Sequence, residues 1–82
     1  MKRDLAYYNG LPWRVVIDSQ RQEDGSLLFV ASHPEFDGVL GTGRTREAAL
    51  ADLHAARRSI IEALLAEGYP LPEPAPAPST GA

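Results

Sequence analysis

The chain of 82 residues contains no cysteine. That absence excludes a disulfide, a thiolate nucleophile and a cysteine-based zinc site, and it fits the reducing cytoplasm, where we expect the protein to reside. No apolar run approaches the roughly 18 residues that a membrane span requires. The opening segment MKRDLAYYNG also lacks the apolar stretch of a signal peptide. We therefore expect no association with a membrane.

Basic residues are also scarce, because eight lysines and arginines stand against eleven acids and the net charge is −3. Nucleic-acid-binding domains normally carry a basic face that meets the phosphates, so direct DNA or RNA binding by this chain alone is disfavoured. An acidic chain instead suits a basic protein partner. A domain of this size has a small core, so we expect a partner chain or a homo-oligomer to help stabilise it.

Three short segments have the character of β-strands. Residues 13–19 and 26–32 are rich in β-branched and aromatic side chains, and the Asp24-Gly25 pair between them is typical of a hairpin turn. Both faces of the second segment are apolar, which predicts a central strand or one covered on two sides. The glycine-rich segment 39–43 predicts an edge strand or a bulged strand. Together they predict an antiparallel meander.

One long amphipathic helix is predicted after the strands. Its apolar residues recur at helical spacing over residues 46–67, with Thr45 as N-cap and Gly68 as terminator. The fold class is therefore α+β, a three-stranded antiparallel meander packed by one long helix in the order β-β-β-α, over residues 1–69. Beyond it, proline at every second position predicts a Pro/Ala-rich, extended or disordered tail over residues 70–82.

Residues that could carry out chemistry are few. Acids such as Asp18 could suggest the carboxylate cluster of a metal-dependent nuclease, but they fall near turns, where solvated acids are common. His33 and His54 lack the spacing of metal ligands. The segment GTGRTR lacks the lysine of a phosphate-binding loop, so we assign its glycines to a bulge and a tight turn. We predict no catalytic residue, no metal and no cofactor, with a degenerate nuclease as a rival hypothesis.

The corner after the second strand places an aromatic residue between acids. We interpret this stretch as a structural corner and expect His33 to be partly exposed; in a binding role, His33, Glu35, Phe36 and Asp37 would protrude together. Aromatic residues often anchor interfaces, and acids steer cationic partners. Trp13 and Phe36 belong either to the core margin or to such an interface. The predicted partner-binding site is therefore Trp13, His33, Glu35, Phe36 and Asp37.

Four segments carry a family resemblance: YYNGLPWRVVI, EDGSLLFVASHPEFDGV, GTGRTREAALADLHAA and EGYPLPEP. In this order they resemble the HicB antitoxin family, specifically its partial RNase H-like N-terminal domain, over about residues 7–74. The resemblance implies a binding module without enzymatic activity. Such a module covers the active site of HicA, a small basic RNase toxin, in a type II toxin–antitoxin system.

The chain departs from the family in ways that affect this expectation. Its corner reads Phe36-Asp37-Gly38-Val39, where the family often has Leu-Pro-Gly-Cys. Family members often continue into a DNA-binding segment, whereas a proline-rich tail stands here, so we expect no operator binding by this chain. The alternative is a stand-alone homo-oligomeric scaffold without a toxin partner, whose tail is a recognition segment.

Overall fold

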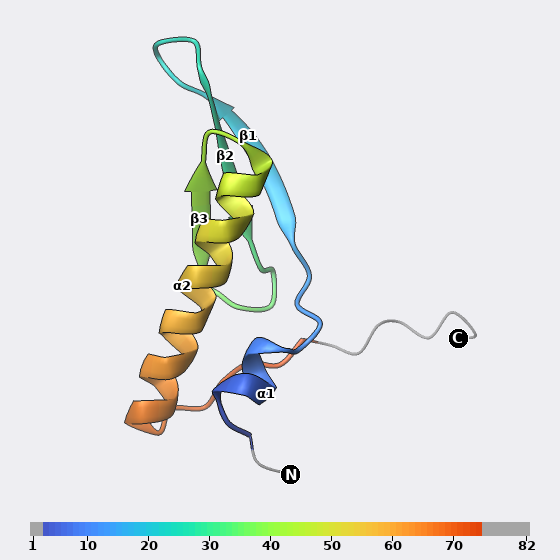
Figure 1. The fold of residues 1–82 in the computed structure, drawn as a ribbon, viewed down its shortest axis with the longest axis vertical. Coiled ribbons are helices and arrows are strands. Elements are labelled where there is room, and N and C mark those ends of the chain that lie inside the picture. Colours follow the sequence, from blue (N-terminus) through green and yellow to red (C-terminus); the bar gives the residue numbers. More distant parts are fainter. Residues whose placement is uncertain (1–2, 75–82) are drawn as a thin grey trace, which may run out of the picture.

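The computed structural model describes residues 3–74, which form two layers, a three-stranded antiparallel sheet and a long helix packed on one of its faces (Figure 1). The elements are α1 (Leu5–Asn9), β1 (Val16–Arg21), β2 (Leu27–Ser32), β3 (Leu40–Gly43) and α2 (Arg46–Glu67). The strand order β1-β2-β3 confirms the predicted α+β fold and the central position of β2. Helix α1 was not predicted.

The β1–β2 hairpin keeps an unbroken antiparallel register, from Val16 opposite Ser32 to Arg21 opposite Leu27. Gly25 in its turn has a φ of 88°, a conformation that glycine adopts without steric cost. The predicted Asp-Gly turn is thereby confirmed.

Strand β1 begins at Val16 rather than at Trp13, where the sequence predicted it. Its partner β2 ends at Ser32, and Pro34 has no N–H that could extend the ladder. The Trp13 side chain is instead 8% exposed and turned into the core. There its Nε1 donates a hydrogen bond to the Tyr8 carbonyl at 2.9 Å.

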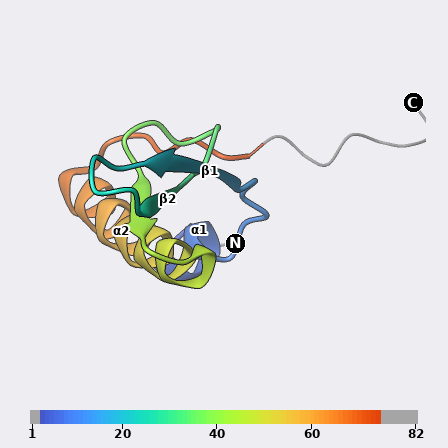
Figure 2. The ribbon, with the colours of Figure 1, turned by 90° about the horizontal axis from the view of Figure 1, so that it is seen from above.

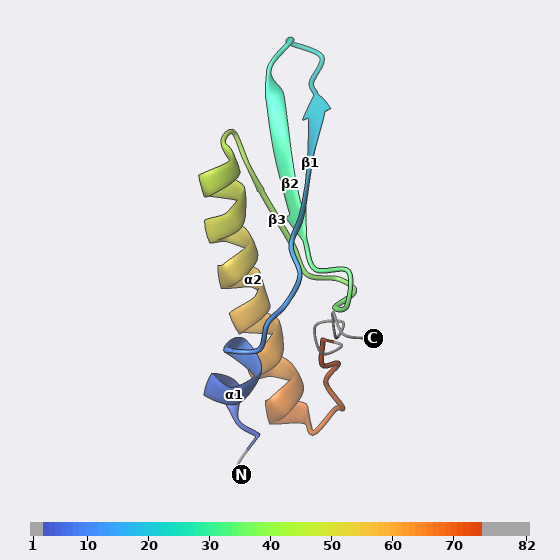
Figure 3. The same cartoon turned by 90° about the vertical axis from the view of Figure 1, so that its right-hand side faces the viewer.

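Helix α2 has the predicted bounds. The Thr45 hydroxyl accepts a hydrogen bond from the Ala48 N–H at 3.0 Å, which satisfies one of the free donors of the first turn. Gly68, with a φ of 76°, ends the helix in the left-handed conformation. The 22 residues of α2 span about 33 Å, whereas the four of β3 span about 13 Å. The helix therefore extends well beyond the sheet (Figure 3).

The sheet and α2 approach each other closely because small residues line their contact. A Cβ atom on Gly41 would lie 2.1 Å from the Leu53 backbone nitrogen, and one on Gly43 would lie 2.6 Å from the Ala48 Cβ. The β2–β3 register runs without an extra residue, so the predicted bulge is wrong and these glycines make room for the helix. The fully buried residues at the contact include Ala31, Ala49 and Leu53, each 0% exposed.

Helix α1 covers the part of α2 that extends beyond the sheet. The Asp4 carboxylate caps α1 by accepting a hydrogen bond from the Tyr7 N–H at 3.0 Å. The helix has only five residues, too few for a helical period to be recognised in the sequence. Its apolar side chains, together with Leu11 just after it, join one hydrophobic cluster with the C-terminal half of α2: Leu5, Tyr7, Tyr8, Leu11, Ile60, Ile61, Leu64 and Leu65.

Residues 70–74 are neither helix nor strand, but they contact the domain. Leu71 packs against the core cluster. The Glu73 carboxylate accepts a hydrogen bond from the Tyr7 hydroxyl at 3.3 Å and pairs with the Arg3 guanidinium at 3.2 Å. These contacts join the start of the predicted tail to α1. The rest of that tail, residues 75–82, lies outside the described residues.

Candidate interaction surface

The predicted aromatic anchor of the corner is buried. Phe36 is 4% exposed, and its ring lies 5.2 Å from the Trp13 ring between centroids. Phe36 therefore does not protrude, because Trp13 and Phe36 pack against each other as part of the core. Of the two alternatives left open for Trp13 and Phe36, their exposure of 8% and 4% favours the core.

His33 is also buried, with 3% exposed, so the predicted partial exposure is wrong. Its Nδ1 lies 2.6 Å from the Arg14 carbonyl oxygen and its Nε2 lies 3.0 Å from Arg57 Nη1. A carbonyl can only accept, so Nδ1 carries the proton and Nε2 accepts from the guanidinium. The ring is therefore neutral, and burial, assisted by the Arg57 charge, lowers the pKa of His33.

The Arg57 guanidinium extends this contact into a bridge between elements. Its Nε donates a hydrogen bond to Asn9 Oδ1 at 3.0 Å, so one side chain of α2 holds both the end of α1 and the residue that follows β2. Burial lowers the pKa of Arg57. His33 and Arg57 thus have a structural role, for which neither the histidine spacing nor the charge pattern of the sequence gave a signal.

Glu35 is held by the domain itself. Its side chain is 11% exposed, and its carboxylate accepts hydrogen bonds from the Arg14 backbone N–H at 3.3 Å and from Arg14 Nε at 3.3 Å. Burial raises the pKa of Glu35, but hydrogen bonds from its own backbone and from Arg14 outweigh burial and lower it. Among the predicted binding residues, Asp37 alone is exposed. The corner as a whole therefore offers no protruding aromatic.

The described residues hold few features of a chemical site. Residues 3–74 contain no group of three or more histidines, cysteines and acids arranged to hold a metal ion. Every buried side-chain nitrogen and oxygen in this part of the chain has a hydrogen-bond partner. Nor does any helix within it combine the length and apolar composition needed to cross a membrane. The remaining candidates are surfaces.

One face of the sheet is uncovered. Odd-numbered strand residues such as Ala31 and Gly41 face α2, so the even-numbered residues point to the opposite side. Figures 2 and 3 show α2 on the first side and no described helix on the second. Val16 and Leu40 on this side are 41% and 56% exposed. We define the open face by its apolar residues, none of which belongs to the core cluster: Val16, Leu28, Val30 and Leu40.

Among the polar residues of the open face, the one charged residue is an acid. Asp18 lies directly opposite Val30 in the register, and the other polar outward residues are uncharged: Gln20, Ser32 and Thr42. No lysine or arginine occupies an outward position of the described strands. An apolar surface with a single acid suits a partner that presents apolar and cationic side chains.

The backbone of β1 forms a second exposed feature. In an antiparallel ladder, backbone groups point alternately toward and away from the neighbouring strand. The Arg14 N–H binds Glu35 and the Arg14 carbonyl binds His33, so even-numbered residues direct their groups inward. The free edge of β1 is therefore formed by the outward backbone groups of Val15, Ile17, Ser19 and Arg21.

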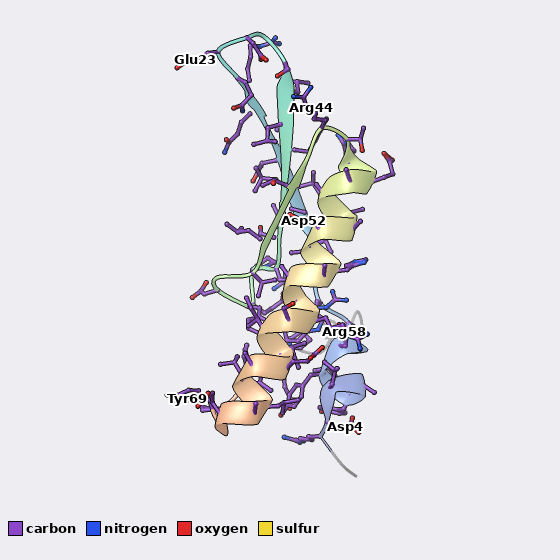
Figure 4. The ribbon with its side chains drawn as sticks, turned by 60° about the vertical axis from the view of Figure 1, so that its left-hand side comes forward. Asp4, Glu23, Arg44, Asp52, Arg58 and Tyr69 are labelled. Carbon is purple, nitrogen blue, oxygen red and sulfur yellow. The ribbon has the colours of Figure 1, made fainter. Side chains whose placement is uncertain are left out.

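The opposite edge of the sheet is partly closed. The Thr42 N–H, which points away from β2, donates a hydrogen bond to the Asp52 carboxylate of α2 at 2.9 Å. Figure 4 shows Asp52 on the helix beside the strands. Inward or covering charges of this kind are a common way to prevent an edge strand from pairing further. Within residues 3–74, β1 thus presents the open edge.

The sequence could not locate these two surfaces. It gave two apolar faces for β2 but not which of them would be covered, because that depends on where α2 packs. Comparisons with protein-family models, curated proteins and solved structures found no match for this chain.

Proposed function

We propose that this chain is an antitoxin-like binding module, which sequesters and inhibits a small basic RNase toxin of a type II toxin–antitoxin system in the cytoplasm. The sequence resemblance to the HicB family supports this proposal, and HicA is the toxin type that the resemblance implies. The chain has no catalytic role of its own in this proposal, and it needs no metal or cofactor.

The open face is the observation that carries the proposal. Val16 and Leu40 leave apolar surface in contact with water on a small domain, and such patches mark interaction sites when they are contiguous. Asp18 on the same face and the net charge of −3 would attract a cationic partner. This surface replaces the corner, where the predicted anchor Phe36 is buried.

The test uses capture followed by an activity measurement. The tagged chain is used to isolate small basic proteins from its native cells, and the RNase activity of each captured protein is measured with and without the chain. We expect an RNase that the wild-type chain inhibits. Val30→Lys and Leu40→Lys should relieve the inhibition, because each places a cation on the open face.

Ser59→Lys provides the matched control, since it adds the same charge to an exposed position of α2. It should inhibit as well as wild type. An RNase inhibited equally by all three variants would show that the open face is not the binding surface. Capture of no protein with RNase activity would refute the function itself.

The nuclease rival is tested separately. We expect the purified chain to cleave neither RNA nor an RNA–DNA hybrid in the presence of Mg²⁺. Asp18, the acid considered for such chemistry, lies on the open face opposite Val30. Cleavage that Asp18→Asn abolishes would establish the nuclease and contradict the binding-only proposal.

A second candidate function is that of a stand-alone homo-oligomeric scaffold. The free edge of β1 favours it, because unpaired strand edges join with other strands. Self-association is compatible with toxin binding as well, since the edge and the open face are different surfaces.

A further inference from the structure

The free edge of β1 is open for pairing. It runs over Val15, Ile17, Ser19 and Arg21 without a proline or a bulge, two of the devices that protect edge strands, although Asp18 and Arg21 place one charge of each sign on β1. Val15 and Val16 beside it are 42% and 41% exposed. Exposed valines next to unpaired backbone groups form a surface suited to another extended strand.

The partly closed edge at β3 limits what kind of assembly is possible. A molecule with two open edges can add copies at both sides and grow into a fibre, whereas one with a single open edge stops at a symmetric pair. Asp52 occupies the Thr42 N–H on the β3 side. A second copy of this chain that pairs through β1 therefore gives a closed dimer.

We propose that two copies pair antiparallel through their β1 strands, with the two-fold axis at Ile17, to form one continuous six-stranded sheet. This inference rests on the self-association proposed above and not on the toxin. A two-fold axis perpendicular to the sheet leaves both α2 helices on one side. The two open faces then adjoin on the other side, free for a partner.

The side chains choose between the possible registers. An axis at Asp18 would place the two Asp18 carboxylates directly opposite each other, and like charges in that position are destabilising. An axis at Ser19 would place Val16 opposite Gln22 of the second copy. An axis at Ile17 places Ile17 against its own copy, so that the valines beside it are covered at the centre of the interface.

The same register pairs opposite charges. Asp18 lies opposite Val16 of the second copy and diagonal to both Arg14 and Asp18 of that copy, so the two acids no longer stand directly opposite each other and a cation lies within the reach of a long side chain. Arg14 is exposed, and its Nε is the guanidinium nitrogen that contacts Glu35. The pairing of a single strand gives a small interface, so the dimer should be weak.

The absence of cysteine from the chain allows a direct test of the register. Ile17→Cys, Asp18→Cys and Ser19→Cys each introduce a single thiol at one possible axis. A residue that faces its own copy across a strand pair lies about 4.5–5.5 Å away between Cα atoms, within the range of a disulfide. We expect Ile17→Cys to give the disulfide dimer under mild oxidation, and the other two variants to give little.

Two variants that introduce opposite charges at Val16 keep the test valid if Ile17→Cys folds poorly. Val16 is exposed, so Val16→Glu and Val16→Lys should both leave the monomer folded by circular dichroism. In the proposed register, Val16→Glu places a carboxylate directly opposite Asp18 of the second copy, and the two-fold symmetry creates this repulsive pair at two positions. Val16→Glu should therefore weaken dimerisation by about tenfold. Val16→Lys should dimerise at least as well as wild type.

Sedimentation equilibrium up to about 1 mM measures the dimerisation, because so small an interface is weak. Preferential cross-linking of Asp18→Cys or Ser19→Cys would overturn the register. A dimer that none of the three thiols cross-links, and that both Val16 variants leave unchanged, would overturn the β1 interface while self-association stands. A monomer at every concentration would overturn self-association itself and leave the toxin proposal untouched.

Discussion

The two faces of the sheet are made by neighbouring residues of the same strands, yet they differ in burial and in packing. On the inner face, Ala31 is completely buried, as is Leu53 of the helix α2 that covers it, and Gly41 has no space for a Cβ atom. On the open face, Leu40 is 56% exposed. The residues of the inner face are therefore constrained by the close approach of the sheet backbone to the α2 backbone. The residues of the open face are constrained only by contact with water or with a partner.

This difference predicts how each face responds to substitution. Protein interiors are close-packed, so a single added or removed carbon atom is felt there. At exposed positions away from such contacts, substitutions usually change the free energy of unfolding by less than about 0.5 kcal/mol. Matched substitutions on the two faces test the comparison directly.

The largest effect should come from Gly41→Ala. The new Cβ atom would meet the Leu53 backbone nitrogen at 2.1 Å and the Ala49 carbonyl oxygen at 2.4 Å, and neither backbone can move without displacing α2. We expect a loss of about 3 kcal/mol or more, at the upper end of what overpacking costs. Urea denaturation measures it, with Thr42→Ala as the control on the open face. Equal stability of the two variants would show that the contact is looser than described.

Removing a large side chain of α2 that packs on the inner face should have the next largest effect. Leu53→Ala leaves a cavity at a fully buried position and should lower the free energy of unfolding by about 2–5 kcal/mol. The same change at Leu40, on the open face, should cost much less because the side chain is half in water. Similar losses for both variants would show that another molecule covers the open face under the conditions of the experiment.

His33 continues the inner face at the end of β2 and should make stability depend on pH. Burial first, and the positive charges of Arg57 and His54, lower its pKa, while the Arg14 carbonyl and Glu35 act in the opposite direction. The folded state thus takes up a proton less readily than the unfolded state, whose histidine titrates near 6.5. The contribution of His33 to the free energy of unfolding is therefore fully present above that pH. It is lost as the pH drops below that value, by at most about 1.4 kcal/mol per pH unit.

Chemical denaturation between pH 5 and 8 can isolate this contribution. His33→Asn removes the titrating ring but keeps a side-chain N–H that can donate to the Arg14 carbonyl, so the acid-dependent loss should shrink. His54→Gln, at an exposed position, should leave the loss intact. A pH profile that follows His54 instead of His33 would contradict the assignment.

The smallest effect is expected from Val30→Thr on the open face. The substitution preserves shape and strand preference, and Val30 does not belong to the core cluster. Thermal unfolding should show a change within about 0.5 kcal/mol. A larger loss of stability that appears at high protein concentration and disappears on dilution would contradict this expectation. It would show that a second copy covers Val30 with an apolar surface.

The sequence predicted the parts of the fold that depend on local signals. Thr45 and Gly68 set the ends of α2, and Asp24-Gly25 set the hairpin turn, because caps and turns depend on residues within a few positions. The exposure of His33 was predicted wrongly, and Phe36 stayed undecided between core and interface, because the burial of both depends on Trp13 and Arg57, which are distant in sequence. Polar and acidic neighbours made the corner resemble a surface loop, although the tertiary contacts bury it.

The length of α2 relative to the sheet has a consequence for motion. The N-terminal half of the helix can open only if the sheet contact at Gly41 and Leu53 is lost, which amounts to unfolding the domain. The C-terminal half depends on α1, on Leu71 and on the Arg57 bridge to Asn9, a smaller set of contacts that can detach as a unit. One continuous helix should therefore exchange its amide hydrogens at two rates, with the slower amides over the strands and the faster ones beyond them.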